Sequence, residues 1–546
     1  MPSARGLIVV LVCLAASIAT QAMQAPGSDR RVRPGGIQGI VTSGDEPGQP
    51  LEGAEVQIRG ANPSESKIVR TDAKGRFSFN ELLPGRYVLS AWKNGFALLK
   101  YGQRAAEEQS QVVEVVSGAV ATHIDFALPR AGVIVVKVLD EFGLPAAGAI
   151  VDIYSPRFVD GKADLISANR NRYLPTTDDR GEVRLFGLSP GDYKLSARLG
   201  PLGPFGSRPE GPLVYFPATL SRDDAQSLRL RARDELFATI QLVATRTGKI
   251  EGNIVAANGG PLISAEVRLI SLRPSAFSAS PPMTAFAGRF GIAAVPPGDY
   301  ILEVRGISND ATEEFANVAV SHFGNDFSLS IRTARLGSIR GRIVLDDLEA
   351  AEAIDPKSLQ VVPTVVGYPA GSVPQVSINE DLTFAVDRII GVGFLRLRDS
   401  SGRWQLTSVS VDGEDVTDRQ TDLVEGFSGR RVEIRISRAT TRLDGIATDA
   451  QGRSTKDYVA IAFASDEGKW TPVSRFIMTA RPDQTGRFLF TGLPPFDYYL
   501  AAVDVLAPGQ EYDRLTLERL RRSATQISLR KGESSQVALF IQSLIR

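Results

Sequence analysis

The sequence has almost no cysteine or histidine: of its 546 residues, one is cysteine and two are histidines. Cys13 lies in an N-terminal apolar run, so the rest of the chain has no thiol and must be stabilised by apolar cores. His123 and His322 are far apart, and no G-x-S-x-G, H-E-x-x-H or phosphate-binding glycine motif is present. The sequence therefore predicts no enzyme, no catalytic residue, no metal site and no cofactor, with both histidines structural or at the surface.

The chain also lacks an excess of charge of either sign. It has 62 Lys and Arg residues against 62 Asp and Glu residues, without a long run of one sign. Because nucleic-acid binders usually carry a basic face, no nucleic-acid partner is expected. Aromatic residues make up only 7% of the chain, whereas Gly (51) and Pro (32) are abundant, which is typical of many strands joined by tight turns.

The N-terminus holds an apolar run, Gly6–Ala19, that is too short to span a membrane. A positive charge precedes it and small residues follow, which is typical of a secretory signal peptide, residues 1–25, with cleavage after Ala22 or Ala25. We therefore expect an exported protein in the periplasm, at the cell surface or in the medium. The last residue is Arg546 rather than the aromatic residue typical of outer-membrane proteins, so no membrane insertion is expected after signal cleavage.

A 19-residue arrangement recurs about every hundred residues. Its copies keep a Gly, two apolar residues two positions apart, a further apolar residue, a Pro and a Tyr at the same offsets: Thr71–Leu89, Thr177–Leu195, Thr284–Leu302 and Pro482–Leu500. A weaker copy, Asn379–Leu397, keeps aromatic residues ten apart but loses the Pro and the turn Gly. The chain therefore contains five repeat units.

The residue types of this arrangement predict two tight turns. An Asp at its start can accept hydrogen bonds from backbone N–H groups two or three residues on, and the following Gly takes the positive φ that closes a hairpin. Pro–Gly suits the centre of a type II turn, where Gly again takes positive φ, and the Tyr begins the next strand. The predicted structural turn residues are Asp72, Gly75, Pro84, Gly85, Tyr87, Asp178, Gly181, Pro190, Gly191, Tyr193, Gly288, Pro297, Gly298, Tyr300, Gly486, Pro495 and Tyr498.

Each unit opens and closes with a strand of alternating apolar residues. One position of the opening strand is Gly39, Gly252, Gly341 or Gly445, with Val136 in the second unit. Many short strands and no helical period predict an all-β chain of five tandem β-sandwiches: 35–130, 131–246, 247–334, a degenerate 335–440, and 441–546.

The spacing of the units predicts a shape and its loops. Because the junctions are short, we expect a stiff rod, on the order of 150 Å long. Segments 155–174 and 413–429 are expected to be long polar loops on a rim.

The motifs resemble a known family. The combination of G-x-[IV]-x-G, P-x-x-G-A-x-V-x-[IL] and T-D-x-x-G-x-[FV]-x-[FL]-x-x-L-x-P-G-x-Y is similar to the carboxypeptidase regulatory-like domain, a transthyretin-like sandwich related to Cna B-type repeats and grouped with carbohydrate-binding (starch-binding-like) folds. The resemblance is strong in units one to three, good in five and weak in four. It implies immunoglobulin/transthyretin-like sandwiches and an accessory or adhesive role, without peptidase activity.

Two special chemistries are considered and not expected. Cna B-type relatives can form a Lys–Asn or Lys–Asp isopeptide bond beside a buried Glu, and the third unit contains Lys249, Glu303 and Asn325/Asp326. Period-two alternation, however, places Lys249 and Glu303 opposite the core residues beside them. The pairs Asp178–Asp179 and Glu380–Asp381 lack the spacing of a calcium loop, so turn capping is the expected use.

The candidate ligand-binding residues are the three tryptophans, Trp92, Trp404 and Trp470, each near a turn. An exposed indole could stack on a pyranose ring, whereas packing in a core is the competing interpretation. The predicted function is a non-catalytic binding or spacer module at the bacterial cell envelope, with a glycan or a protein as partner. Carbohydrate binding is the first hypothesis. Protein adhesion, or a scaffold for an envelope peptidase or outer-membrane receptor, is the alternative.

Overall fold

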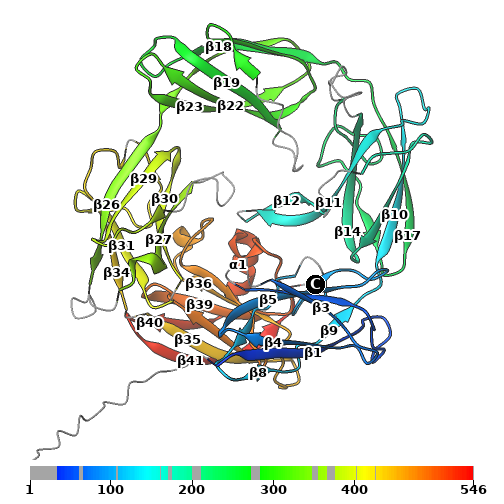
Figure 1. Cartoon of the computed structure of the whole chain (residues 1–546), viewed down its shortest axis with the longest axis vertical. Helices are drawn as coiled ribbons and strands as arrows, with labels where there is room; N and C mark the ends of the chain where they lie inside the picture. Colours follow the sequence, from blue (N-terminus) through cyan, green and yellow to red (C-terminus); the bar gives the residue numbers. More distant parts are fainter. Residues whose placement is uncertain are drawn as a thin grey trace, which may run out of the picture.

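The computed structural model describes residues 33–60, 66–105, 108–159, 161–169, 175–199, 211–271, 283–346, 354–365, 376–400, 402–424, 426–438 and 440–544. The predicted signal peptide lies outside these residues. The chain is all-β, as predicted, and its strands fall into five consecutive groups, which we call groups 1 to 5 (Figure 1). Within the described ranges, no helix is both long and apolar enough to cross a membrane.

Groups 1 and 2 each contain two sheets. The strands of group 1 are β1 (Gly35–Ser43), β2 (Glu55–Arg59), β3 (Lys67–Arg70), β4 (Arg76–Leu82), β5 (Gly85–Trp92), β6 (Leu99–Lys100), β7 (Val113–Val115), β8 (Val120–Ala121) and β9 (Phe126–Leu128). Those of group 2 are β10 (Gly132–Leu139), β11 (Ala149–Val159), β12 (Lys162–Ser167), β13 (Glu182–Leu188), β14 (Gly191–Leu199), β15 (Val214–Tyr215), β16 (Leu228–Leu230) and β17 (Glu235–Gln241). In group 2 the sheets are β13-β10-β17 and β12-β11-β14-β15, with β16 also on β14.

Groups 3 and 4 repeat this plan. The strands of group 3 are β18 (Gly248–Val255), β19 (Leu262–Ser271), β20 (Met283–Ala285), β21 (Arg289–Val295), β22 (Gly298–Ser308), β23 (Glu313–His322), β24 (Phe327–Arg332) and β25 (Ala334–Arg335). Those of group 4 are β26 (Gly337–Leu345), β27 (Leu359–Val365), β28 (Val376–Ser377), β29 (Thr383–Ile389), β30 (Val392–Asp399), β31 (Gln405–Val411), β32 (Glu414–Asp415), β33 (Thr421–Asp422) and β34 (Val432–Ser437), with the 3-10 turn η3 (Pro356–Ser358) before β27.

Group 5 differs because its strands join into one seven-stranded sheet. They are β35 (Arg442–Thr448), β36 (Val459–Ala464), β37 (Ile477–Ala480), β38 (Arg487–Thr491), β39 (Phe496–Val503), β40 (Thr525–Leu529) and β41 (Ser534–Gln542). Two 3-10 turns, η4 (Glu467–Lys469) and η5 (Gln510–Tyr512), and the helix α1 (Arg514–Arg521) complete the group. The sequence reading missed α1, although Asp513 caps its N-terminus and Leu517 and Leu520 are three apart and buried.

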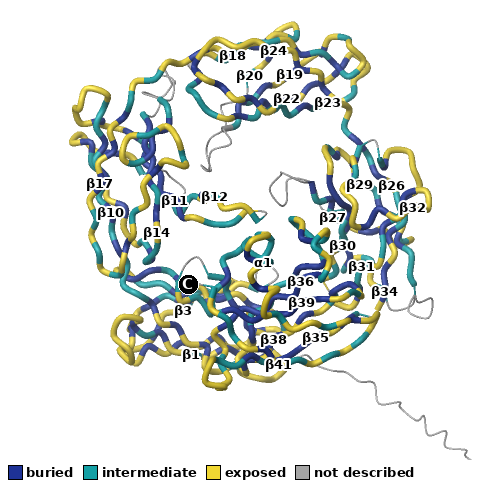
Figure 2. The backbone as a smooth tube through the Cα atoms, turned by 180° about the vertical axis from the view of Figure 1, so that it is seen from behind, coloured by how far each residue is buried: buried dark blue, intermediate teal, exposed yellow. Residues whose placement is uncertain are grey.

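Each group closes on its own first strand. The last long strands, β9, β17, β24, β34 and β41, pair in parallel with β1, β10, β18, β26 and β35. A separate cluster of buried apolar side chains lies inside each group. Alternate residues of the strands face these clusters, and Figure 2 shows buried residues in every group. In group 5 a second cluster packs the outer face of β36 and β39 under α1.

The first predicted turn is confirmed. Gly75, Gly181, Gly288 and Gly486 have φ between 71° and 80°. The Asp178 carboxylate accepts hydrogen bonds from the N–H groups of Arg180 (3.0 Å) and Glu182 (2.8 Å), two and four residues on. These hydrogen bonds, that from Glu182 most, lower the pKa of Asp178. The carboxylate therefore caps a turn.

The second predicted turn is wrong in its geometry. Gly85 and Gly191 are the first residues of strands and are not among the residues of positive φ, and Gly298 has a φ of 159°. In groups 1, 2 and 5 the left-handed residue instead stands three positions before the Pro, at Glu81 (φ 56°), Gly187 (73°) and Gly492 (83°). There the first sheet ends in a bulge, so the chain has already turned before it reaches Pro–Gly.

The tyrosine of the repeat closes this turn through its hydroxyl group. Tyr87, Tyr193, Tyr300 and Tyr498 each donate to the carbonyl oxygen four residues earlier, over 2.7 to 3.0 Å. All four side chains are buried, so the hydroxyl satisfies a carbonyl that the turn leaves free. In group 4 the same position is Phe394, which lacks the hydroxyl group.

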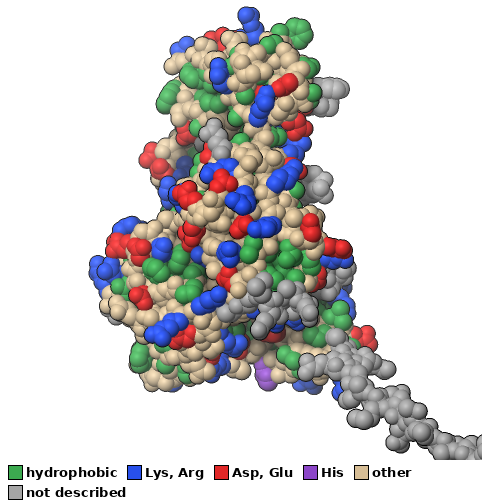
Figure 3. Space-filling model, turned by 90° about the vertical axis from the view of Figure 1, so that its left-hand side faces the viewer, with side chains coloured by type: hydrophobic (Ala, Val, Ile, Leu, Met, Phe, Trp, Pro, Cys, Tyr) green, Lys and Arg blue, Asp and Glu red, His purple; other side chains and the backbone are tan. Residues whose placement is uncertain are grey.

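The expected rod is wrong, because the five groups follow one another around a closed ring in which group 5 lies against group 1 (Figure 1). The contact is polar: Arg481 Nη2 donates to Gly102 O (2.5 Å), Arg104 Nη2 to Asp504 O (3.3 Å) and Gln109 Nε2 to Thr479 Oγ1 (3.4 Å). Charges of both signs are interspersed over the face in Figure 3.

A second closing contact comes from a segment expected to be a loop. The first part of 155–174 is a hairpin of β11 and β12, paired from Tyr154–Ser167 to Val159–Lys162. It projects into the middle of the ring toward α1 (Figure 1). A Cβ atom on Gly161 would overlap the carbonyl oxygen of Tyr512 in η5. The sequence did hold a signal for it, since Asp–Gly at 160–161 is a strong hairpin pair.

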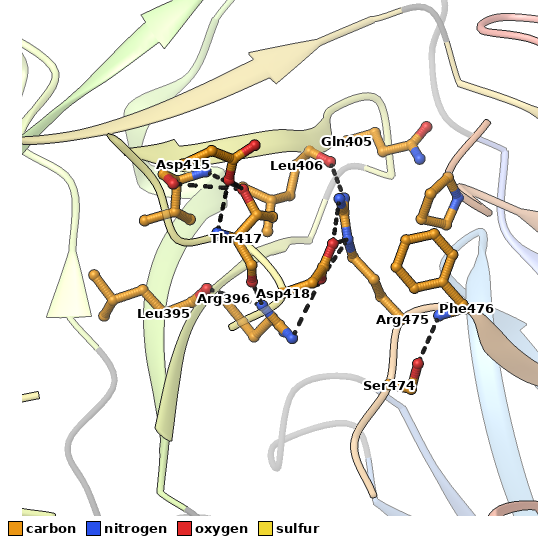
Figure 4. A network of polar contacts seen from close by, with 12 residues as sticks. Leu395, Arg396, Gln405, Leu406, Asp415, Thr417, Asp418, Ser474, Arg475 and Phe476 are labelled. Carbon is orange, nitrogen blue, oxygen red and sulfur yellow. Dashed lines mark hydrogen bonds and ion pairs between the residues drawn. The ribbon is translucent and has the colours of Figure 1, made fainter. Parts of the chain in front are cut away.

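Groups 4 and 5 are joined by a charged network (Figure 4). The Arg475 guanidinium binds both oxygens of the Asp418 carboxylate at 2.9 and 3.1 Å and donates to Leu406 O at 3.0 Å. Arg396 lies 3.7 Å from the same carboxylate, and burial lowers its pKa to about 10. Because Nε and Nη2 of Arg475 each donate to one oxygen of Asp418, the pair is bidentate and links the two groups in a defined geometry.

Candidate functional site

The structure separates the three candidate tryptophans. Trp404 is 7% exposed in the core of group 4, and Trp470 is 6% exposed under α1, with Nε1 donating to Ala464 O at 2.7 Å. Both indoles therefore pack cores, which contradicts their expected role as exposed platforms. A position near a turn does not predict an exposed indole here, because the residues after each turn return into the sheet. Trp92, in contrast, lines a cavity.

Trp92 lines a cleft of about 790 Å³ between groups 1 and 2, which we call the Trp92 cleft. This volume is within the range of small-molecule sites. One wall is the end of β5 and the segment 93–98; the other is formed by β11, β12 and the end of β13. Trp92 is the last residue of β5 and is half-buried. Two groups together therefore form the cleft, each contributing one wall.

Aromatic residues line several sides of the cleft. Besides Trp92 they are Phe96, Phe186 and Tyr193. Phe186 is 71% exposed, whereas Phe96 is buried with its ring 4.2 Å from the guanidinium carbon of Arg130. The sequence reading missed Phe186, because alternation in β13 predicts only that it points away from the core.

The polar groups of the cleft are hydroxyls, amides and cations. Ser155, Ser167, Asn94 and Asn169 line it together with Lys93, Arg157, Arg184 and Ser189. Ser189 is 3% exposed, and its Oγ has no hydrogen-bond partner among the described residues. A buried hydroxyl without a partner is costly, so a ligand group that reached it would gain a hydrogen bond.

A second cavity, of about 600 Å³, shares Leu98 and Arg157 with the Trp92 cleft. Its other lining residues include Lys100, Gln103 and Pro508, so it extends from group 1 to group 5. The two cavities therefore meet beside Arg157.

The groups considered for an isopeptide bond are not together. Lys249 is exposed and forms an ion pair with Glu251, which raises the pKa of Lys249. Glu303 pairs instead with Arg305 at 3.1 Å, and the Asp326 carboxylate accepts from the Lys249 backbone N–H at 2.9 Å. This arrangement has no acid beside a buried lysine and supports no amide bond formation.

The histidines lie apart as well. His123 is exposed with a φ of 61°, and its Nδ1 is 3.0 Å from Thr122 Oγ1. His322 is 3% exposed on β23, and its Nδ1 is 3.2 Å from Pro296 O. Across the described part of the chain, no three His, Cys, Asp or Glu side chains gather in a way that could hold a metal ion.

Solved structures similar to the chain share little sequence with it. The Bacillus anthracis TIE protein is 15% identical, with a TM-score of 0.16, over 55% of this chain and 51% of that one, so the match spans about half of its length. The minor pilin GBS52 of Streptococcus agalactiae is 15% identical over 38% of this chain and 96% of that one, with a TM-score of 0.21. Two B repeat units of the Staphylococcus aureus collagen-binding protein are 10% identical over 74% and 98%, with a TM-score of 0.13. No curated protein matches the chain.

The family comparison is more specific. Residues 36–129 match the carboxypeptidase regulatory-like domain. The match runs from β1 to the residue after β9, so it covers group 1, where the opening strand, the Asp–Gly turn and the Tyr hydroxyl bond all occur. The first strand group of this protein is therefore similar to the carboxypeptidase regulatory-like domain.

Proposed function

We propose that this protein is an exported, non-catalytic binding module of the cell envelope that holds a saccharide in the Trp92 cleft. The observation that carries the proposal is the cleft itself, in which a half-buried indole lies among hydroxyl and amide groups in about 790 Å³. Flat aromatic rings pack against the apolar faces of sugar rings, while polar groups pair with sugar hydroxyls.

The ring of strand groups has a scaffold role in this proposal. The cleft lies between groups 1 and 2, and group 5 contacts both of them. We propose that the five groups are the domains 35–130, 131–246, 247–334, 335–440 and 441–546, preceded by a signal peptide. Their closure then fixes the two walls of the cleft at one distance, so that less free energy is spent on ordering when the ligand binds.

The test is binding of the mature protein, residues 26–546, to an array of neutral and acidic polysaccharides. Trp92→Ala removes the indole, and binding should weaken by about tenfold or more. The matched control is Phe237→Ala, because Phe237 is 75% exposed on β17, outside the cleft. Binding that survives Trp92→Ala unchanged, or an array without binding, would contradict the proposal.

A protein partner is the second candidate function, and exposed phenylalanines favour it. Phe142, Phe286 and Phe323 are 79%, 87% and 79% exposed. Such side chains mark protein contacts when they gather into a patch. These three, however, belong to different turns of groups 2 and 3 rather than to one patch. The saccharide cleft is therefore the first choice.

A further inference from the structure

We propose that the ligand of the Trp92 cleft is an acidic oligosaccharide, carrying carboxylate or phosphate groups, and that Arg157 binds the anionic group. This inference rests on the proposed saccharide-binding function. It concerns the chemical class of the ligand, which the aromatic rings of the cleft do not determine.

The first argument is the sign of charge. Among the described residues that line the Trp92 cleft, the charged ones are Lys93, Arg157 and Arg184, and all are cations. The Arg184 guanidinium lies 3.4 Å from Glu235, and the Lys93 ammonium donates to the Glu52 carbonyl oxygen. Because water is partly excluded from a cleft, these charges attract an anion more strongly than they would in bulk solvent.

The second argument is the position of Arg157. It lies on β11, in the hairpin that β11 forms with β12. Arg157 is half-buried where the two cavities meet. A planar guanidinium there can bind a carboxylate or phosphate through two parallel hydrogen bonds.

The third argument is length. The Trp92 cleft and the second cavity together run from Trp92 past Arg157 to Pro508, with volumes of about 790 and 600 Å³. The second cavity adds Lys100 and the amides Gln103 and Gln109. Glu108, the acid among its described lining residues, lies 3.6 Å from Arg104. A chain of several sugar residues would contact groups 1, 2 and 5 at once.

The test compares charged and neutral forms of the same chain by titration calorimetry on the mature protein. Hexagalacturonate is set against its methyl ester, and yeast phosphomannan against mannan, so that the two arms separate carboxylate from phosphate. We expect at least one acidic form to bind about tenfold more tightly than its neutral partner, with an affinity that falls as NaCl is added.

The variant Arg157→Gln should remove that preference and weaken binding of the acidic form about tenfold, while Arg157→Lys should keep part of it. The control is Arg180→Gln, which makes the same change of net charge at the opposite end of β13, where Arg180 is exposed. Equal binding of neutral and acidic chains, with Trp92→Ala still weakening both, would overturn this inference and leave the proposed function intact. The absence of any binding would overturn both.

Discussion

Gly39 lies in β1 directly opposite Phe77 of β4, with the backbone of residue 124 against it. A Cβ atom on Gly39 would overlap the Ile124 carbonyl oxygen and lie 2.9 Å from the Phe77 ring. The same pairing recurs as Gly252 with Phe290, Gly341 with Phe384 and Gly445 with Phe488. In group 2 both partners change together, to Val136 and Val183. The glycine is thus one half of a packing pair whose other half is a phenylalanine.

Gly39→Ala should therefore destabilise group 1 by about 1–3 kcal/mol, because the added methyl group meets backbone rather than a flexible side chain. Urea unfolding, and separately differential scanning calorimetry, measures the change in the free energy of unfolding. Gly85→Ala is the matched control in the same group, since a Cβ atom there meets nothing closer than 3.9 Å. Equal stability of the two variants would show that the close approach at Gly39 relaxes at no cost.

For single residues, the sequence predicted which positions form turns better than it predicted backbone geometry or burial. The repeat placed Asp178 and Gly181 in a capped turn, because side chain, φ and spacing act within five residues. It misplaced the left-handed residue near Pro–Gly, since a bulge in the paired strand decides that geometry. It could not tell Trp92 from Trp404 and Trp470, because burial of an indole depends on segments distant in sequence.

Strand β11 is the element whose environment departs most from a simple sandwich strand. Val151 and Ile153 face the core of group 2, while Tyr154 packs on the other face with Leu165 and Tyr215. Asp152 shares that second face and is 4% exposed, with its Oδ1 accepting from the Ile153 N–H (2.9 Å) and Ser167 Oγ (3.0 Å). Burial outweighs these hydrogen bonds and raises the pKa of Asp152.

A raised pKa in the folded state means that folding favours the protonated acid. The contribution of Asp152 is therefore greatest below its unfolded pKa, near 3.8, and is lost as the pH rises from there through the raised folded pKa. We expect the native chain to lose stability relative to the variant Asp152→Asn as the pH rises from 3.5 to 7. The measurement is the difference in melting temperature between the two proteins at each pH, for the transition that the substitution shifts. A difference that is constant with pH would contradict this. Asp164→Asn, at a half-exposed acid, is the control.

The hairpin of β11 and β12 also explains why the candidate site was only partly foreseen. Alternation and the Tyr strand predicted the sheets on either side of the cleft, and Trp92 at the end of β5. The hairpin that forms the other wall, with Arg157 on it, was read as a polar loop. A polar hairpin away from a sandwich core shows no alternation, so only its turn pair signals it.

The ring is closed by polar contacts between segments that are 345 to 400 residues apart in the sequence. Arg481 is the most buried of the cations there, and this burial lowers its pKa. Its Nη2 donates to Gly102 O, while Gln111 Nε2 reaches Lys456 O at 3.5 Å. A repeat pattern does not report such contacts, since it describes the strands within one unit and not the surfaces between distant units. Short junctions therefore suggested a rod, whereas the chain turns around a ring and brings group 5 back to group 1 (Figure 1).

The ring predicts the shape in solution. Small-angle X-ray scattering of residues 26–546 should give a maximum dimension well below the roughly 150 Å of five sandwiches in line. Arg481→Ala removes the buried donor at the closing contact, so we expect a larger radius of gyration, and more so in high salt. Arg453→Ala is the control in the same group, because Arg453 is 74% exposed and pairs only with groups of its own turn. A native chain that scatters as a rod would show that these contacts do not hold group 5 against group 1. The same opening should weaken saccharide binding, because the second cavity takes Pro508 from group 5.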